Sequence, residues 1–157
     1  MSGGVSISGG EPLMQRRPLM KVLTGAKSMG IHTAIETNGF LGAELTDSDL
    51  DNIDLVLLGI KTWDRKRHRA LTGRDNTPTL ELARRLAARR LPVWARFVLV
   101  PGLTDNPADI AQIADFAGSS ATWRASTCFP SSRWAAPGAY HALSAFRAAS
   151  AYRRYGE

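Results

Sequence analysis

Short apolar runs alternate along this chain with longer segments in which apolar residues recur at helical spacing. The runs are rich in β-branched and aliphatic residues, which predicts strands at residues 5–8, 31–37, 53–60 and 91–100. The run over 53–60 is apolar almost without interruption, and such runs are typical of strands buried on both faces in parallel sheets.

The segments between these runs predict helices. Leu19, Leu23 and Ala26 share one face of a helix expected over 13–29, which Gly30 ends. Further helices are expected to begin near Thr46 and to occupy residues 64–71, 77–90 and 105–116. Repeated strand–helix units predict an α/β fold with a parallel sheet and right-handed crossovers. The alternation stops after residue 118, so we divide the chain into a strand–helix domain over 1–118 and an atypical tail over 119–157.

Composition narrows the class of protein. The 157 residues, 44% of them hydrophobic, suit one globular domain. No apolar run is long enough to cross a bilayer and no signal-peptide pattern begins the chain, so we expect a cytoplasmic protein without a membrane partner. The single cysteine, Cys128, excludes an internal disulfide and a multi-cysteine metal site.

The net charge of +6 does not by itself indicate a nucleic-acid partner. Within the helix expected over 77–90, the arginines are spaced like a solvated face; they are Arg84, Arg85, Arg89 and Arg90. We therefore expect no nucleic acid among the partners.

The turn after the first predicted strand carries the most informative residues. Gly9 and Gly10 let the backbone turn sharply and approach a ligand closely, because they have no Cβ. Glu11 follows at the carboxyl end of the strand, where α/β proteins place ligand-contacting groups. A plain strand followed by a glycine turn is the alternative for so short a motif.

The surrounding text, VSISGGEPLMQ, resembles the GGEP segment of radical S-adenosylmethionine (SAM) enzymes, specifically of the activating enzymes for pyruvate formate-lyase and other glycyl-radical enzymes. The resemblance implies that Gly9, Gly10 and Glu11 receive the amino group of SAM. Three further segments resemble the same family at consistent spacing, so that the likeness runs to about residue 116; they are residues 30–40, 54–64 and 93–102.

The second of these segments ends in Glu36-Thr37-Asn38-Gly39, where the family has Asp-Thr-Asn-Gly. The resemblance implies that Glu36 lies near SAM and a bound cation, and that Glu36 and Thr37 line the floor of the site. The alternative is a strand-end acid that hydrogen bonds to a turn.

Two cations complete the residues that the resemblance assigns to SAM. Lys61 matches the lysine of the family's Asp-x-Lys, whereas Gly59 stands in place of the aspartate. Arg96 lies in a predicted buried strand, and the resemblance gives it the SAM carboxylate as its partner; a salt bridge to Glu36 is the alternative. An ordinary exposed lysine is the alternative for Lys61.

The fold that the resemblance implies is a partial (β/α)₆ TIM-like barrel with about four β-α units, lacking its first strand and so exposing a sheet edge. The family's [4Fe–4S] cluster needs three thiolates at Cys-x3-Cys-x2-Cys spacing, and this chain has no such motif. We therefore assign no catalytic residue and interpret the chain as an N-terminally truncated fragment.

The resemblance implies a parent protein that cleaves SAM reductively to a 5′-deoxyadenosyl radical and so generates a glycyl radical on pyruvate formate-lyase or a related partner enzyme. It implies flavodoxin or ferredoxin as the electron donor. We expect this chain to be inactive alone. The alternatives are a non-catalytic SAM- or partner-binding remnant, or another radical SAM subtype.

The tail over 119–157 departs from the family text. Its codons are consistent with a frameshift near residues 119–121, which also accounts for the tail's arginines. A genuine divergent extension is the alternative.

Overall fold

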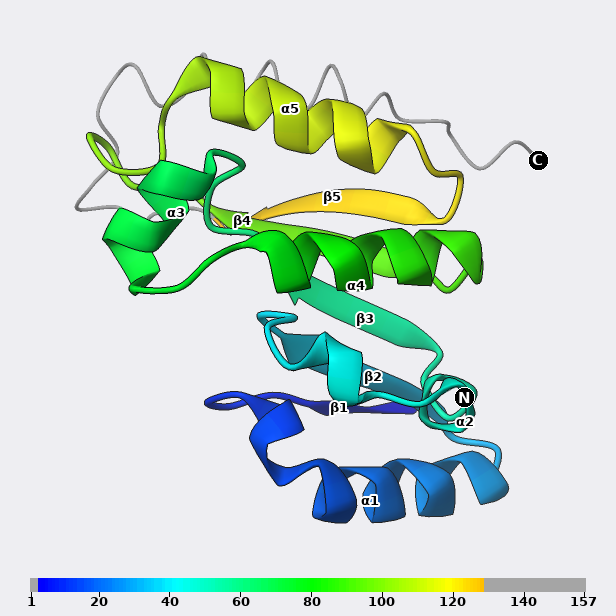
Figure 1. Cartoon of the computed structure of the whole chain (residues 1–157). Coiled ribbons are helices and arrows are strands. Elements are labelled where there is room, and N and C mark those ends of the chain that lie inside the picture. Colours follow the sequence, from blue (N-terminus) through cyan, green and yellow to red (C-terminus); the bar gives the residue numbers. More distant parts are fainter. Residues whose placement is uncertain (1–2, 129–157) are drawn as a thin grey trace. The chain divides into compact units, whose positions relative to one another are not determined.

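The computed structural model describes residues 3–128, with side chains described through Trp123. Helices and strands alternate as the sequence predicts (Figure 1). The elements are β1 (Gly4–Ile7), η1 (Pro12–Gln15), α1 (Arg16–Ser28), β2 (His32–Thr37), η2 (Gly42–Glu44), α2 (Asp47–Leu50), β3 (Leu55–Gly59), α3 (Arg65–Thr72), α4 (Thr77–Ala88), β4 (Val93–Val98), α5 (Pro107–Gly118) and β5 (Trp123–Cys128). None of the described helices is both long enough and apolar enough to span a membrane.

The chain divides into two compact units. One comprises the residues up to Gly59 together with Thr77–Trp94, and the other comprises Ile60–Asn76 and the residues from Ala95 onward. Strand β4 contributes its first residues to the first unit and the remainder to the second.

The sheet of the first unit is parallel, as predicted. Strand β1 pairs with β2 and β2 with β3, in a register that aligns Ile7 with Ile35 and Ile35 with Val56. Val56 donates its backbone N–H to Pro92 O just before β4, at 3.0 Å. Among the strands of residues 3–128, β1 stands at the end of the strand order, and its residues are half-buried at best.

The two faces of this sheet differ in burial. Ile35, Val56 and Leu58 share one face and are fully buried. On the opposite face Leu55 and Leu57 are only half-buried. The prediction that the 53–60 run is buried on both faces is therefore wrong. In an uninterrupted apolar run the two faces of a strand have the same polarity. Periodicity alone therefore does not distinguish a strand buried on one face from a strand buried on both.

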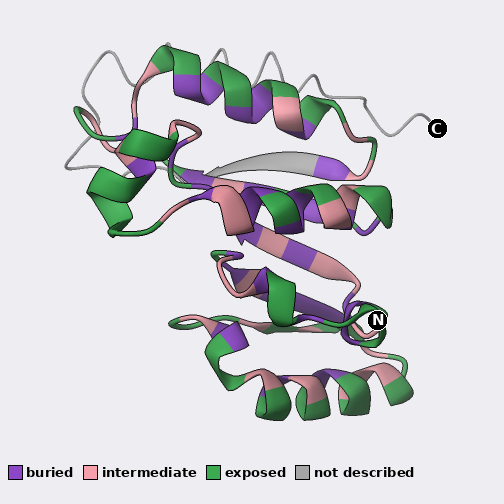
Figure 2. Ribbon diagram, in the orientation of Figure 1, coloured by how far each residue is buried: buried purple, intermediate pink, exposed green. Residues whose placement is uncertain are grey.

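Helices α1 and α4 cover the first unit with short apolar stripes. Leu19 and Leu23 of α1 are buried as predicted, and α1 packs against β2. Helix α4 packs against η2 so closely that a Cβ added at Gly42 would lie 2.7 Å from Leu82 Cβ. In Figure 2 the outer side of each helix is exposed.

The second unit contains a strand that the sequence analysis did not predict. Strand β5 begins at Trp123, inside the segment assigned to the atypical tail, and α5 packs against it. The Phe116 ring contacts Trp63 and Trp123, with ring centroids 5.2 Å apart in both pairs. A short strand of mixed polarity has no clear alternation of apolar and polar residues. The contact of its Trp123 with Phe116 is therefore seen only in the structure. Residues 129–157, which carry most of the predicted tail, lie outside the described residues.

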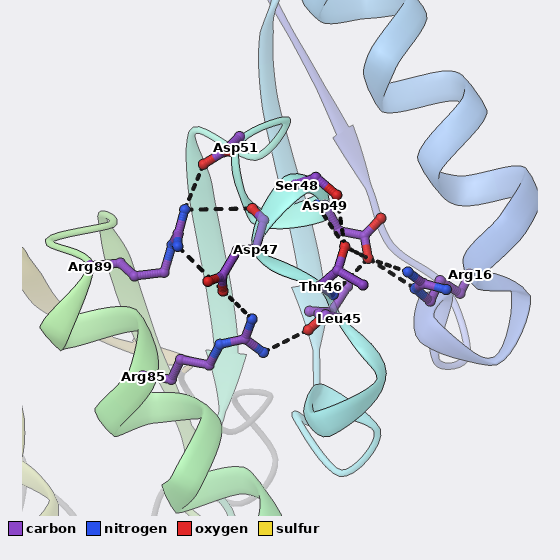
Figure 3. A network of polar contacts seen from close by, with 9 residues as sticks. All are labelled: Arg16, Leu45, Thr46, Asp47, Ser48, Asp49, Asp51, Arg85 and Arg89. Carbon is purple, nitrogen blue, oxygen red and sulfur yellow. Dashed lines mark hydrogen bonds and ion pairs between the residues drawn. The ribbon is translucent and has the colours of Figure 1, made fainter.

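A polar network joins α1, α2 and α4 within the first unit (Figure 3). Thr46 and Asp49 form a capping box at the start of α2, and Arg16 of α1 donates from Nε to Asp49 Oδ2 at 3.0 Å. Arg85 of α4 pairs with Asp47, and Arg89, directly after α4, pairs with Asp51.

The prediction of a solvated arginine face is wrong for Arg85, which is half-buried and donates from Nη1 to Leu45 O at 2.6 Å. Arg89 is exposed as predicted, and it also pairs with Asp51. The signal was present in the sequence: Asp47 and Asp51 share the same four-residue spacing as the two arginines.

Three carboxylates of this unit have pKa values held below the usual range. The Arg85 hydrogen bond is the main cause of the lowered pKa of Asp47. Burial opposes ionisation of Asp49 and Asp54, but hydrogen bonds outweigh it and lower the pKa of both groups. For Asp49 the donors are Thr46 and Arg16, and for Asp54 they are Lys27 and Thr33.

We expect acid to destabilise the first unit through these carboxylates. Because their folded-state pKa values are lowered, their contribution to stability is fully present above the unfolded-state pKa of about 4 and is lost as pH falls through the folded values. The Asp49→Asn variant should lose stability near neutral pH and show a shallower decline in acid. Urea midpoints measured from neutral pH downward test this. Asp115→Asn on α5, an exposed site, is the control, and an equal change in both variants would contradict the expectation.

We also expect Gly42→Ala to destabilise the protein, because the new methyl group would overlap Leu82 at the α4–η2 contact. Overpacking of this kind costs about 1–3 kcal/mol. Gly25→Ala is the matched control: a Cβ there meets nothing within 4 Å, and it lies inside α1. Alanine at that site should stabilise by about 0.5–1 kcal/mol. Chemical denaturation of the two variants should move the midpoint in opposite directions.

Candidate functional site

The turn after β1 presents open backbone to solvent. Gly9 and Gly10 have φ values of +99° and +56°, in the region that side chains rarely adopt. A Cβ added at either position would meet no atom of residues 3–128 within 4 Å, apart from the adjoining residues. The two glycines therefore leave room beside their main-chain groups; their contact with a ligand stays a prediction.

Glu11 fastens this turn to the turn that follows β2. Its Oε1 accepts from Thr37 Oγ1 at 2.7 Å and from Leu13 N at 3.1 Å, the latter capping η1. Its Oε2 accepts from Asn38 N at 2.8 Å. A carboxylate offers roughly four lone-pair positions, so these three donors leave capacity for a further donor. Glu11 both fixes the loop and retains an accepting position.

The second turn is built to hold Thr37 and Asn38 in place. Thr37 is buried, and its hydroxyl also accepts from Gly39 N at 3.0 Å. Asn38 O accepts from Thr79 Oγ1 of α4 at 2.8 Å. Gly39 has φ +75°, and a Cβ there would lie 2.8 Å from Leu58 Cδ1. The sequence analysis quoted Asn38 only as part of a motif and did not predict that its backbone N–H donates a hydrogen bond to Glu11.

Glu36 projects from the opposite face of β2 to Thr37, because successive residues of a strand alternate between faces. It is half-buried, and its partner in the register is Leu57. Over residues 3–128 no three His, Cys, Asp or Glu side chains gather as a ligand set for a metal ion. The cation assigned to Glu36 therefore stays a prediction.

Lys61 and Arg96 both belong to the second unit. Ile60, the residue before Lys61, donates its N–H to Arg96 O at 2.9 Å. Lys61 is exposed and Arg96 is half-buried on β4. The structure thus brings the backbones of these two predicted residues together. Their convergence with Glu11 on one ligand stays a prediction.

Gly59 replaces the family's aspartate at the end of β3, and space for a side chain exists there. An added Cβ would lie 3.6 Å from Thr37 O and 3.9 Å from Asn38 Cα, both ordinary contacts. The glycine is therefore not imposed by crowding.

The loop from His68 to Asn76 is held by hydrogen bonds to nearby backbone oxygens. His68 Nδ1 lies 2.9 Å from Arg74 O, and Gly73 caps α3 with φ +71°. Asn76 Nδ2 donates to Trp63 O at 2.7 Å. These bonds close the loop and tie its end to the backbone of Trp63.

The Glu11 link generates a prediction for the site. In Glu11→Gln one oxygen becomes an amide nitrogen, which cannot accept a hydrogen bond, so either Asn38 N–H or the Thr37–Leu13 pair loses its acceptor. We expect a loss of about 1–2 kcal/mol in unfolding free energy and faster hydrogen exchange at the Asn38 amide. Glu81→Gln on the exposed side of α4 should change neither quantity. Unaltered Asn38 exchange in Glu11→Gln would show that the carboxylate does not hold the turn.

Comparisons with known proteins agree with this geometry. The family model of the radical SAM superfamily matches residues 2–117. The pyruvate formate-lyase-activating enzyme of Staphylococcus epidermidis is 39% identical over 123 residues, which cover 74% of this chain and 49% of that enzyme. The enzyme of the same name from Staphylococcus aureus strain USA300 is 38% identical over the same shares. The chain spans about half the length of the curated relatives it matches.

Solved structures share the fold. A domain of pyruvate-formate lyase-activating enzyme from Bacteroides vulgatus has a TM-score of 0.74 at 23% identity and covers 94% of each chain. Streptococcus suis SuiB bound to S-adenosylmethionine has a TM-score of 0.68 at 22% identity, covering 82% of this chain and 30% of that one. The fold class predicted from the sequence is confirmed. Since the family model spans most of the chain, the protein belongs to the radical SAM superfamily and resembles its pyruvate formate-lyase-activating members.

Proposed function

We propose that this chain is the SAM-binding part of a glycyl-radical-enzyme activating protein, and that the turns after β1 and β2 hold the methionine end of SAM. Enzymes of this superfamily use SAM together with a [4Fe–4S] cluster, and the SuiB relative is a complex with SAM. SAM supplies the carbon–sulfur bond that the family's chemistry cleaves.

The hydrogen bonds of Glu11 carry this proposal. They join the turn at Gly9–Glu11 to the turn at Thr37–Gly39, at the carboxyl ends of the adjacent parallel strands β1 and β2. We call these two joined turns the ledge. Ligands of open α/β sheets bind at such strand ends. A ledge that is fixed before the ligand arrives loses less conformational freedom on binding.

The residues of the ledge suit the amino group of SAM. An ammonium is a hydrogen-bond donor, so it pairs with main-chain oxygens at Gly9 and Gly10 and with the remaining acceptor position of Glu11. Thr37 acts through Glu11, as a positioning residue, because its hydroxyl is committed to Glu11 and Gly39.

The other predicted residues extend the proposal to the rest of the ligand. Lys61 and Arg96 are cations, which suits them to the SAM carboxylate and ribose. Glu36 offers a carboxylate, which a hard cation accepts as a ligand.

The residues of this chain do not fit a [4Fe–4S] cluster. Three thiolates hold such a cluster with an open iron for SAM, and the sequence contains a single cysteine, Cys128. We therefore assign no step through the cluster and no catalytic residue, and we propose that the chain binds SAM without cleaving it unless a cluster is supplied from elsewhere.

The partners follow from the relatives rather than from the fold. Since the Staphylococcus relatives are named as activating enzymes of pyruvate formate-lyase, we propose a glycyl-radical enzyme as the partner of the complete system. A flavodoxin or ferredoxin as electron donor is part of the same proposal. The second candidate, a binding module without catalysis, is favoured by the single cysteine and makes the same claim about SAM.

Calorimetric titration of the chain with SAM tests the ledge. Gly10→Ala should weaken SAM binding by about tenfold or more, because the methyl group enters the open space and strains a residue at φ +56°. Gly102→Ala is the matched control, since Gly102 also has a positive φ, +77°, with nothing within 4 Å of an added Cβ, and lies outside the ledge.

Both alanine variants should lose about 1–2 kcal/mol of stability from backbone strain. Only Gly10→Ala should lose affinity. If the wild-type chain fails to bind SAM, or if both variants bind it equally, the ledge is not the SAM site.

A further inference from the structure

The ion pairs of the fold account for only part of the positive charge of α1. The helix carries Arg16, Arg17, Lys21 and Lys27 and no acidic residue. Two of these cations lie in its first turn, where the positive end of the helix dipole disfavours positive charge.

Half of this charge is used internally. Arg16 pairs with Asp49, and Lys27 pairs with Asp54. Arg17 and Lys21 are exposed, and no acid of the described residues pairs with either. They stand four residues apart, so they are neighbours on the helix surface and repel each other. Both unfavourable effects would be relieved by an anion bound from outside.

A surface groove lies where these residues gather. It is lined by Arg16, Arg17, Met20, Lys21, Thr24 and Asp49. Met20 and the aliphatic stems of the basic side chains supply apolar contact, while the charged groups of Arg17 and Lys21 form the rim. In Figure 3 Arg16 reaches from α1 to Asp49 of α2.

We propose that this groove, lined by the six residues above, docks an acidic segment of a partner protein, one that carries carboxylates beside an apolar side chain. The carboxylates would pair with Arg17 and Lys21, and the apolar side chain would contact Met20. The proposal goes beyond SAM binding and does not depend on it, because none of the six residues belongs to the ledge.

The positive charge of the groove disfavours two other occupants, a second copy of the chain and the chain's own tail. A second copy that bound through the same face would bring Arg17 and Lys21 against their own counterparts. The chain's own tail over 129–157 is also basic, with Arg133, Arg147, Arg153 and Arg154 against Glu157. Nucleic acid fits less well than protein, because the groove offers only two uncommitted cations and no aromatic ring for stacking.

Amide chemical shifts of the isotope-labelled full chain test the proposal. The probe is a short peptide of glutamates flanking two leucines, with a lysine peptide of the same leucine spacing as its counterpart. We expect the glutamate peptide to shift amides of residues 16–24, and the lysine peptide to leave them unchanged. Because surface charge is screened within about 10 Å at 0.1 M salt, binding should weaken as salt is raised.

The charge-reversal variant R17E/K21E should weaken glutamate-peptide binding by about tenfold or more. The neutral pair R17Q/K21Q serves if charge reversal disturbs the fold. The matched control is K66E/R69E, the same change of charge at two exposed positions of α3, which should retain the wild-type affinity.

Three results would overturn the proposal. One is equal binding of the glutamate peptide by R17E/K21E and by K66E/R69E. Another is a thymidine oligonucleotide that shifts the same amides at lower concentration, which would assign the groove to nucleic acid. The third is concentration-dependent self-association that R17E/K21E abolishes, which would assign the groove to a second copy.

Discussion

The proposed site depends on the hydrogen bonds that the Glu11 carboxylate accepts from the two turns beside it. Parallel strands deliver their carboxyl ends to one edge of a sheet, but the turns beyond them are free to diverge unless something joins them. Here a single side chain accepts from Thr37, Asn38 and Leu13, and so fixes the second turn and the start of η1 together. The glycines preceding it then stay open. Neighbouring residues thus have different roles: Glu11 fixes the two turns, and Gly9 and Gly10 leave their backbone groups accessible.

Around this edge the first unit is held by two different kinds of contact. Apolar packing of Ile35, Val56 and Leu58 fixes one face of the sheet. The perimeter is fixed by ion pairs, in which α2, a helix of a single turn, receives arginines from both α1 and α4. A helix so short has little stability of its own, so its position depends on these partners.

The order of elements was predictable from the sequence because residues that typically begin or end helices stand at the element boundaries. Gly30 ends α1 with φ +70°, and Asn106-Pro107 begins α5 as expected. The burial of β3 was not predictable, since its apolar run looks the same whether one face or both are covered. Strand β5 was missed because its short sequence has no clear period, and its Trp123 anchor packs on Phe116 from another element.

The site was predictable in part, for a different reason. Resemblance to a family named Gly9, Gly10, Glu11 and Thr37, and the structure brings these residues together at one edge. It did not reveal that Thr37 donates to Glu11 or that Asn38 contributes its backbone N–H, because hydrogen bonds between turns leave no sequence pattern. The partner roles of Arg85 and Arg89 were misread for a similar reason: a solvated face and a face that binds a neighbour have the same spacing.

The edge strand has a consequence for handling the protein. Strand β1 consists of Gly4, Val5, Ser6 and Ile7, without a charged residue, and it ends the strand order. Natural sheets protect such edges with charge, proline or a covering segment, because an unguarded edge offers its backbone to strands of other molecules. A lysine in place of the exposed Ser6 would add a charge to this edge, and we expect it to raise the yield of dispersed protein at high concentration.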